Sequence, residues 1–191
     1  MADLSDEDRR RDGLGAGLRW SWATLRQIEK LHALEARLKT DAQQGIPRRF
    51  DYEQRLPFWD LRTETHFCFV AARNLVRALD YLDPPAGTIG FPHFPAELLE
   101  HLKILRDCFE HWDERKNAAT GAGNSGRAYR QLAQLGMGEA ADAYRFGSGD
   151  TKVGGLSLDQ LETTCRKVHL YLRDLEAGSF VWRGWSSVAG P

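Results

Sequence analysis

Residues 95–112, PAELLEHLKILRDCFEHW, form the stretch that decides the fold. Its apolar residues recur at spacings of 4, 3, 4 and 3, at Leu98, Leu102, Leu105, Phe109 and Trp112. This repeat is typical of a helix with one continuous apolar stripe. Pro95 suits the helix start, because the first turn does not need its missing N–H. The stretch therefore predicts an amphipathic helix that packs against other helices.

Three further segments have helical periodicity. Apolar residues recur at helical spacing over about residues 18–40, 59–82 and 157–178. In the second segment we expect Phe67, Leu75 and Leu79 on the buried face. Ser157 with Gln160 three residues later is a capping-box pattern, which predicts the start of the last helix, and Gly178 is expected to end it. Residues 41–58 are expected to be a connector.

The rest of the chain completes a single domain. Residues 142–156 predict a small β-hairpin, because aromatic and β-branched residues flank a Gly-Ser-Gly-Asp turn. We therefore expect an all-α bundle of four to five helices with a small β-hairpin insert. The bundle domain should cover residues 17–178, between a charged and Gly-rich mobile tail (1–16) and an aromatic C-terminal tail (179–191).

The charge composition gives no global preference for nucleic acid. Lys and Arg number 26, Asp and Glu 27, and the formal net charge is -1. RNA binding would therefore require a local basic patch. Arginine supplies 20 of the 26 basic residues, and its planar fork suits phosphate recognition. Codon usage in a GC-rich genome would give the same bias.

The three cysteines are Cys68, Cys108 and Cys165. They are odd in number, far apart and without metal-ligand spacing, so we expect buried free thiols in a reducing compartment. The N-terminal sequence MADLSDED lacks the apolar segment of a signal peptide, and no apolar run approaches a membrane span. The expectation is a cytoplasmic protein with no membrane association, metal or cofactor.

A charged string, RDCFEHWDERK, occupies residues 106–116. Arg106 is followed by the acidic Asp107, and His111 comes five positions after Arg106. A histidine can transfer protons near neutral pH. An arginine can stabilise a phosphate whose negative charge grows in a transition state. Together these two residue types suit RNA cleavage without a metal ion.

The form Arg-polar-x-x-x-His resembles the signature of the HEPN superfamily, small helical-bundle proteins that include many metal-independent endoribonucleases. The resemblance covers about residues 60–175 and implies a HEPN-like bundle. It implies that His111 takes the proton of an RNA 2′-hydroxyl, and that Arg106 stabilises the attacked phosphate. The product would carry a 2′,3′-cyclic phosphate. Such proteins often act as toxins or in anti-phage defence, sometimes beside an antitoxin or another regulatory protein.

The remaining charged residues of the string have supporting roles in this interpretation. Asp107 precedes His111 by four residues and is expected either to orient its imidazole or to raise the pKa of that imidazole. The expected supporting residues are Asp107, Glu110 and Glu114. The expected RNA phosphate-binding residues are Arg115 and Lys116.

A single ideal helix does not bring the pair together. At about 100° per residue, Arg106 and His111 lie roughly 140° apart around the axis. Either the helix distorts near its end, or two chains meet through this helix. The resemblance favours the second arrangement, a homodimer whose cleft is lined by both copies of the motif.

Two other interpretations stay open. The first is a non-catalytic HEPN-like module that binds RNA or another protein, which the near-neutral charge favours. The second is an unrelated helical bundle, in which Arg106 and Glu110 belong to an ordinary solvated face with i,i+4 ion pairs. RNA, a second copy of the chain and a regulatory protein are the expected partners.

Overall fold

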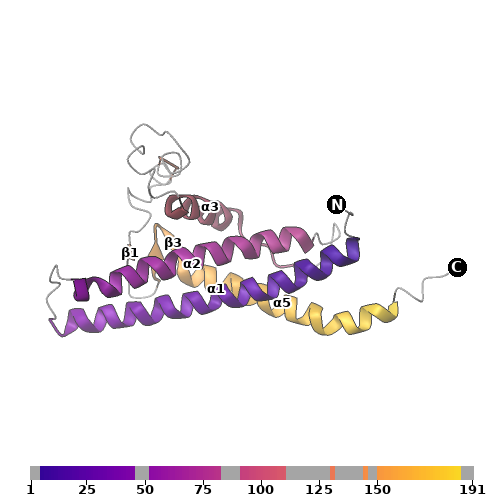
Figure 1. The fold of residues 1–191 in the computed structure, drawn as a ribbon, viewed down its shortest axis with the longest axis horizontal. Coiled ribbons are helices and arrows are strands. Elements are labelled where there is room, and N and C mark those ends of the chain that lie inside the picture. Colours follow the sequence, from indigo (N-terminus) through magenta and orange to yellow (C-terminus); the bar gives the residue numbers. More distant parts are fainter. Residues whose placement is uncertain are drawn as a thin grey trace.

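The computed structural model describes residues 5–45, 52–82, 91–110, 130–131, 144–145 and 150–185, without the side chains of 52–59, 144–145 and 179–185. Four helices of 15 residues or more lie in this part and form an elongated bundle (Figure 1). They are α1 (Asp6–Gln43), α2 (Tyr52–Leu82), α3 (Ala96–Glu110) and α5 (Leu158–Trp185). The predicted helical bundle is confirmed.

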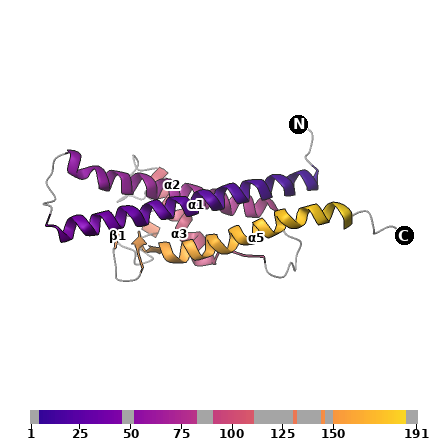
Figure 2. The same cartoon turned by 90° about the horizontal axis from the view of Figure 1, so that it is seen from below.

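The two longest helices form the body of the molecule. α1 and α2 run antiparallel, side by side, and make the most extensive packing contact between described elements (Figures 1 and 2). α5 packs along α1 and runs antiparallel to it, whereas α3 packs on α2. α3 therefore lies across α2 from α1, and the start of α1 and the end of α5 lie at the same end of the bundle.

The start of α1 corrects the predicted mobile tail. The helix begins at Asp6, where Ser5 caps it by accepting a hydrogen bond from the Asp8 N–H at 3.1 Å. Residues 6–16 are therefore helical. Two of the three glycines that suggested flexibility serve close packing, since Gly13 lies against Leu82 of α2 and Gly17 against Leu172 of α5.

Two other predicted boundaries also change. α2 begins at Tyr52, so the second half of the expected connector at 41–58 is helical. α5 continues past Gly178 to Trp185, so residues 179–185 of the expected aromatic tail are helical too. On α2, Leu75 and Leu79 are buried as predicted, but Phe67 is 53% exposed. The buried face of α2 instead includes Leu61, Cys68 and Phe69.

A small antiparallel sheet stands at the start of α5. Its strands, in the order β1-β2-β3, are β1 (Tyr144–Arg145), β2 (Lys152–Val153) and β3 (Leu156–Ser157). β1 pairs with β2, which confirms the predicted hairpin, and β3 was not predicted. Gly154 and Gly155 form the β2–β3 turn with φ of 52° and 86°, as a two-residue type I′ turn requires.

The capping prediction for α5 is confirmed. Ser157 Oγ accepts from the Gln160 N–H at 3.0 Å and donates to Asp150 Oδ1 at 2.8 Å. This N-cap satisfies a backbone donor that the helix start leaves without an internal partner. Because Ser157 belongs to β3 and also caps α5, these hydrogen bonds hold the start of the helix in a fixed orientation relative to the sheet.

One hydrophobic core joins the four helices to β2 and β3. Val153 and Leu156 of the sheet are buried in it beside residues of each of the four helices. The three cysteines are buried free thiols, as predicted. Burial raises the pKa of Cys68 to about 12 and raises that of Cys165 as well. The thiols of Cys68 and Cys165 are therefore protonated at neutral pH and poor nucleophiles.

Candidate functional site

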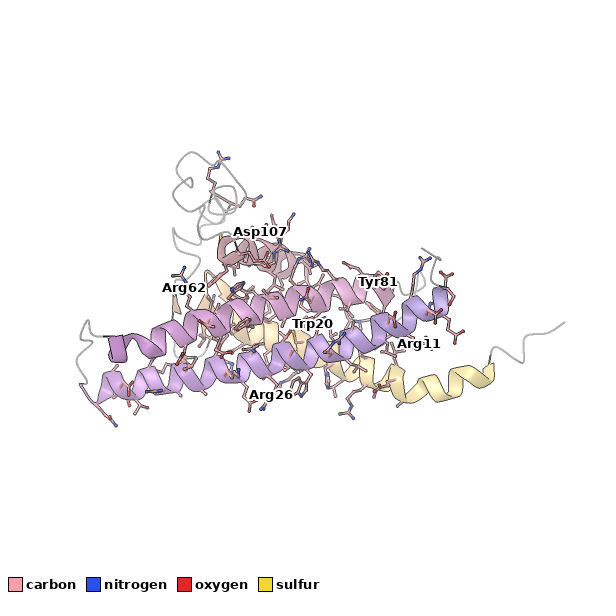
Figure 3. The ribbon with its side chains drawn as sticks, in the orientation of Figure 1. Arg11, Trp20, Arg26, Arg62, Tyr81 and Asp107 are labelled. Atoms are coloured by element: carbon pink, nitrogen blue, oxygen red, sulfur yellow. The ribbon has the colours of Figure 1, made fainter. Side chains whose placement is uncertain are left out.

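The helix α3 carries the described part of the Arg-polar-x-x-x-His motif. Its apolar stripe is buried as predicted at Leu98, Leu102, Leu105 and Phe109. The side chains of Arg106 and Asp107 are 19% and 21% exposed, so they sit at the edge of this stripe. Figure 3 shows Asp107 on α3, across α2 from α1.

Two carboxylates hold the Arg106 guanidinium. Its Nε donates to Asp107 Oδ1 at 2.9 Å, and its Nη2 pairs with the same oxygen. Glu110 Oε2 lies 3.2 Å from Nε, one helical turn later. Two of the three expected supporting residues therefore contact the expected catalytic arginine. Asp107, which was expected to orient His111, is paired with Arg106.

The other members of the motif lie outside the described residues. These are His111, Glu114, Arg115 and Lys116, together with Trp112 of the apolar stripe. The distance between Arg106 and His111, and the expected contact of two motif helices in a dimer, therefore stay predictions.

A second surface was not predicted from the sequence. A groove of about 720 Å³ runs between the first half of α1 and the last turns of α2. Arg11, Arg19 and Arg77 line it, with Asp12 as the one carboxylate among its described lining residues. The aromatic rings on its wall belong to Trp20 and to Tyr81, which is 53% exposed.

The groove combines positive charge with stacking surfaces. Figure 3 shows Arg11 and Tyr81 near the start of α1, and Trp20 further along that helix. Arg11 also pairs with Asp8 at 2.7 Å. Arginines interleaved with aromatic rings suit a nucleic-acid strand, because the rings stack on bases and the guanidinium groups contact phosphates. Since its residues come from two helices, sequence spacing alone does not show this groove.

One described group of side chains has the composition of a metal site. His32 of α1 meets Asp159 and Glu162 of α5, and one ligand atom from each lies within 4.8 Å of the others. The sequence places His32 far from the two carboxylates, which explains why no metal-ligand spacing was visible. This group lies on a different part of the bundle from Arg106.

Comparisons with known proteins do not assign a family. A scan of protein-family models, a search of curated proteins and a search of solved structures each found no match. Within the described part of the chain, no helix combines the length and the apolar character that crossing a bilayer requires.

Proposed function

We propose that this protein is a metal-independent endoribonuclease of the HEPN type. The observation that supports the proposal is the state of Arg106, a guanidinium held by Asp107 and Glu110 at the end of α3, five residues before His111. A cation restrained in this way loses little side-chain entropy when it binds a phosphate. Its planar fork also matches two phosphate oxygens.

The proposed reaction is an internal transfer. His111 accepts the proton of an RNA 2′-hydroxyl, and the 2′-oxygen attacks the adjacent phosphorus. Arg106 stabilises the added negative charge on the phosphate. The bond to the 5′-oxygen breaks, and that oxygen takes a proton from a second acid, for which the His111 of a second copy is the candidate. The products are a 2′,3′-cyclic phosphate and a 5′-hydroxyl, and no metal ion takes part.

The biological setting of the proposal comes from the HEPN resemblance. It is a role as a toxin or in anti-phage defence, in the cytoplasm, with a homodimer formed through the motif helix. An antitoxin or another regulatory protein would then hold the activity in check. Each part of this setting depends on the cleavage reaction.

The deciding experiment is cleavage of a labelled tRNA pool in EDTA by the full chain. Wild type should cleave, and Arg106→Ala and His111→Ala should each lose at least about a hundredfold in rate. Lys103→Ala is the matched control, since Lys103 is an exposed cation on the same helix. No cleavage by wild type, or equal cleavage by all four proteins, would remove the nuclease proposal.

The groove between α1 and α2 favours a second candidate, a non-catalytic RNA-binding module. In that case the chain binds RNA without cutting it, and Arg19 and Arg77 supply the phosphate contacts. Fluorescence anisotropy with a labelled single-stranded RNA distinguishes the candidates. The double variant Arg19→Ala/Arg77→Ala should lose affinity, whereas Arg37→Ala, an exposed cation of α1 outside the groove, should not. RNA binding without cleavage would leave this second candidate standing.

A further inference from the structure

From the His32, Asp159 and Glu162 geometry we infer a binding site for one divalent transition-metal ion, with Zn²⁺ as its best probe. The site joins the middle of α1 to the first turns of α5. It does not depend on the proposed nuclease, whose assay is carried out in EDTA. Four features of the described residues support it.

The first feature is the spacing of the ligand atoms. His32 Nε2 lies 3.4 Å from Glu162 Oε2 and 3.9 Å from Asp159 Oδ1. Zinc binds imidazole nitrogen and carboxylate oxygen at about 2.0–2.2 Å, so neighbouring tetrahedral ligand atoms lie roughly 3.4 Å apart. The two separations from His32 therefore lie within about 0.5 Å of that spacing, and the two carboxylates, whose ligand atoms lie within 4.8 Å of each other, would have to move closer together to hold an ion. Asp159 and Glu162 share one face of α5, because they are three residues apart.

The second feature is a carboxylate behind the histidine. Glu35 Oε2 lies 3.7 Å from His32 Nδ1, on the opposite side of the ring from Nε2. The Glu35 side chain is only 8% exposed, and it is held by Lys39 Nζ at 2.6 Å and by the Thr151 hydroxyl. At 3.7 Å the contact between Glu35 and His32 is electrostatic and not a hydrogen bond. The negative charge on this side of the ring favours the tautomer with hydrogen on Nδ1, which leaves the Nε2 lone pair for a metal.

The third feature is that the two carboxylate oxygens of Glu162 have different partners. Its Oε1 accepts two hydrogen bonds from Arg166, at 2.8 Å from Nε and 2.5 Å from Nη2. Its other oxygen, Oε2, is the one that approaches His32. A salt bridge therefore orients the carboxylate and leaves one oxygen directed at the proposed ion, as partners of metal ligands commonly do.

The fourth feature is an open side. His32 and Glu162 line a hollow of about 350 Å³ together with Trp22, Leu25 and Arg26. A zinc ion with three protein ligands keeps a fourth position for water or an added ligand. The hollow supplies room for that position. The site is thus of the open type, rather than the closed four-ligand type found at purely structural zinc centres.

The same residues could instead form an ion-pair cluster around a protonated imidazole. That arrangement needs no metal, and Asp159 and Glu162 would then act only as counter-ions of His32. Metal binding and ion pairing differ in one measurable respect, which is stoichiometric uptake of Zn²⁺ that depends on both helices.

The experiment is isothermal titration of the EDTA-treated and dialysed full chain with Zn²⁺, compared among wild type, His32→Ala and Asp159→Asn. Asp159 is 48% exposed, so its substitution preserves the fold even if His32→Ala does not. Glu29→Gln is the matched control, because Glu29 lines the same hollow but pairs with Arg26 at 2.5 Å. Circular dichroism checks that each variant is helical.

Wild type should take up one Zn²⁺ more per chain than His32→Ala, and Asp159→Asn should weaken that site by about tenfold or more. Glu29→Gln should stay within about twofold of wild type. Co²⁺ bound in the same site should give a visible absorption band that both ligand variants lose. Absence of Zn²⁺ uptake by wild type, or uptake that both variants retain, would overturn the inference in favour of the ion-pair cluster.

Discussion

Gly17 of α1 lies directly against Leu172 of α5, so that a Cβ on Gly17 would come within 2.8 Å of Leu172 Cδ1. Leu172 is fully buried, and its side chain has little room to move. The absence of a side chain at Gly17 is therefore a condition for the approach of the two helices. The glycine contributes through packing, although it lowers the intrinsic stability of the helix.

Gly17→Ala should accordingly destabilise the protein relative to Gly15→Ala. A Cβ on Gly15 meets nothing within 4 Å. Both substitutions raise the helix propensity by the same amount. The difference between their free energies of unfolding therefore gives the cost of overpacking against Leu172, which should be about 1–3 kcal/mol. Urea unfolding followed by circular dichroism measures it. Equal free energies of unfolding for the two variants would show that α5 does not pack closely on Gly17.

Thr151 should stabilise the fold through its hydrogen bond to Glu35. The hydroxyl donates to a buried carboxylate 116 residues away and thus ties the residue that precedes β2 to α1. Thr151→Val keeps the shape but leaves a carboxylate oxygen without that donor, which should cost about 1–3 kcal/mol of unfolding free energy. Thr40→Val is the control, since Thr40 is exposed and should change stability by less than about 0.5 kcal/mol. A similar small effect at both positions would contradict this role for Thr151.

His169 should make the stability depend on pH. Its Nδ1 lies 2.9 Å from Ser21 Oγ, which itself donates to the Leu18 carbonyl, so the neutral imidazole donates to Ser21. Burial, and to a smaller degree Arg173, lower the pKa of His169 below its ordinary value of 6.5. The unfolded chain therefore binds this proton at a higher pH than the folded protein does.

The sign follows from this difference in proton binding. As the pH falls below 6.5, protonation favours the unfolded chain, and the melting temperature should drop. The loss ends once the pH is below the folded-state pKa. Between about pH 7.5 and about pH 5.5, the melting temperature of His169→Gln should fall by less than that of wild type, as measured by differential scanning calorimetry. Burial also lowers the pKa of His101, so some pH dependence should remain. Identical pH profiles for variant and wild type would rule out His169 as a source.

The sequence predicts α3 well but α1 poorly, for a physical reason. α3 buries large apolar residues at heptad spacing, so its hydrophobic periodicity is a direct record of its packing. The buried face of α1 instead includes Gly13, Gly17, Ser21 and Thr24. The two hydroxyls can be buried because each donates to a carbonyl within its own helix. A pattern search based on apolar residues therefore does not identify this face as buried.

In the sheet and the candidate sites, contacts between residues close in sequence could be predicted, whereas a contact between distant helices could not. Gly154-Gly155 between the apolar Val153 and Leu156 is a recognisable hairpin signal, and β3 follows from it. The Arg106–Glu110 contact could be predicted, because i,i+4 residues meet on any helix. The meeting of His32 with Asp159 and Glu162 could not be predicted, since it depends on how α1 and α5 pack.

Glu110 should weaken RNA binding by neutralising Arg106. Glu110→Gln keeps the size and polarity of the side chain but removes the negative charge that lies beside Arg106 and competes with a phosphate. If Arg106 contacts RNA as proposed, the variant should bind single-stranded RNA about 2–5-fold more tightly, as expected for a partly exposed ion pair worth up to about 1 kcal/mol. Fluorescence anisotropy at low salt measures the affinity, and added salt should reduce the gain.

The matched control for that measurement is Glu97→Gln. Glu97 is an exposed carboxylate in the first turn of α3, so its loss changes the net charge of the protein by the same amount. A gain shared equally by both variants would reflect net charge alone and would remove Arg106 from the RNA contact. A gain specific to Glu110→Gln that disappears when Arg106→Ala is added would instead place the phosphate beside this guanidinium, because only the loss of the local carboxylate then matters.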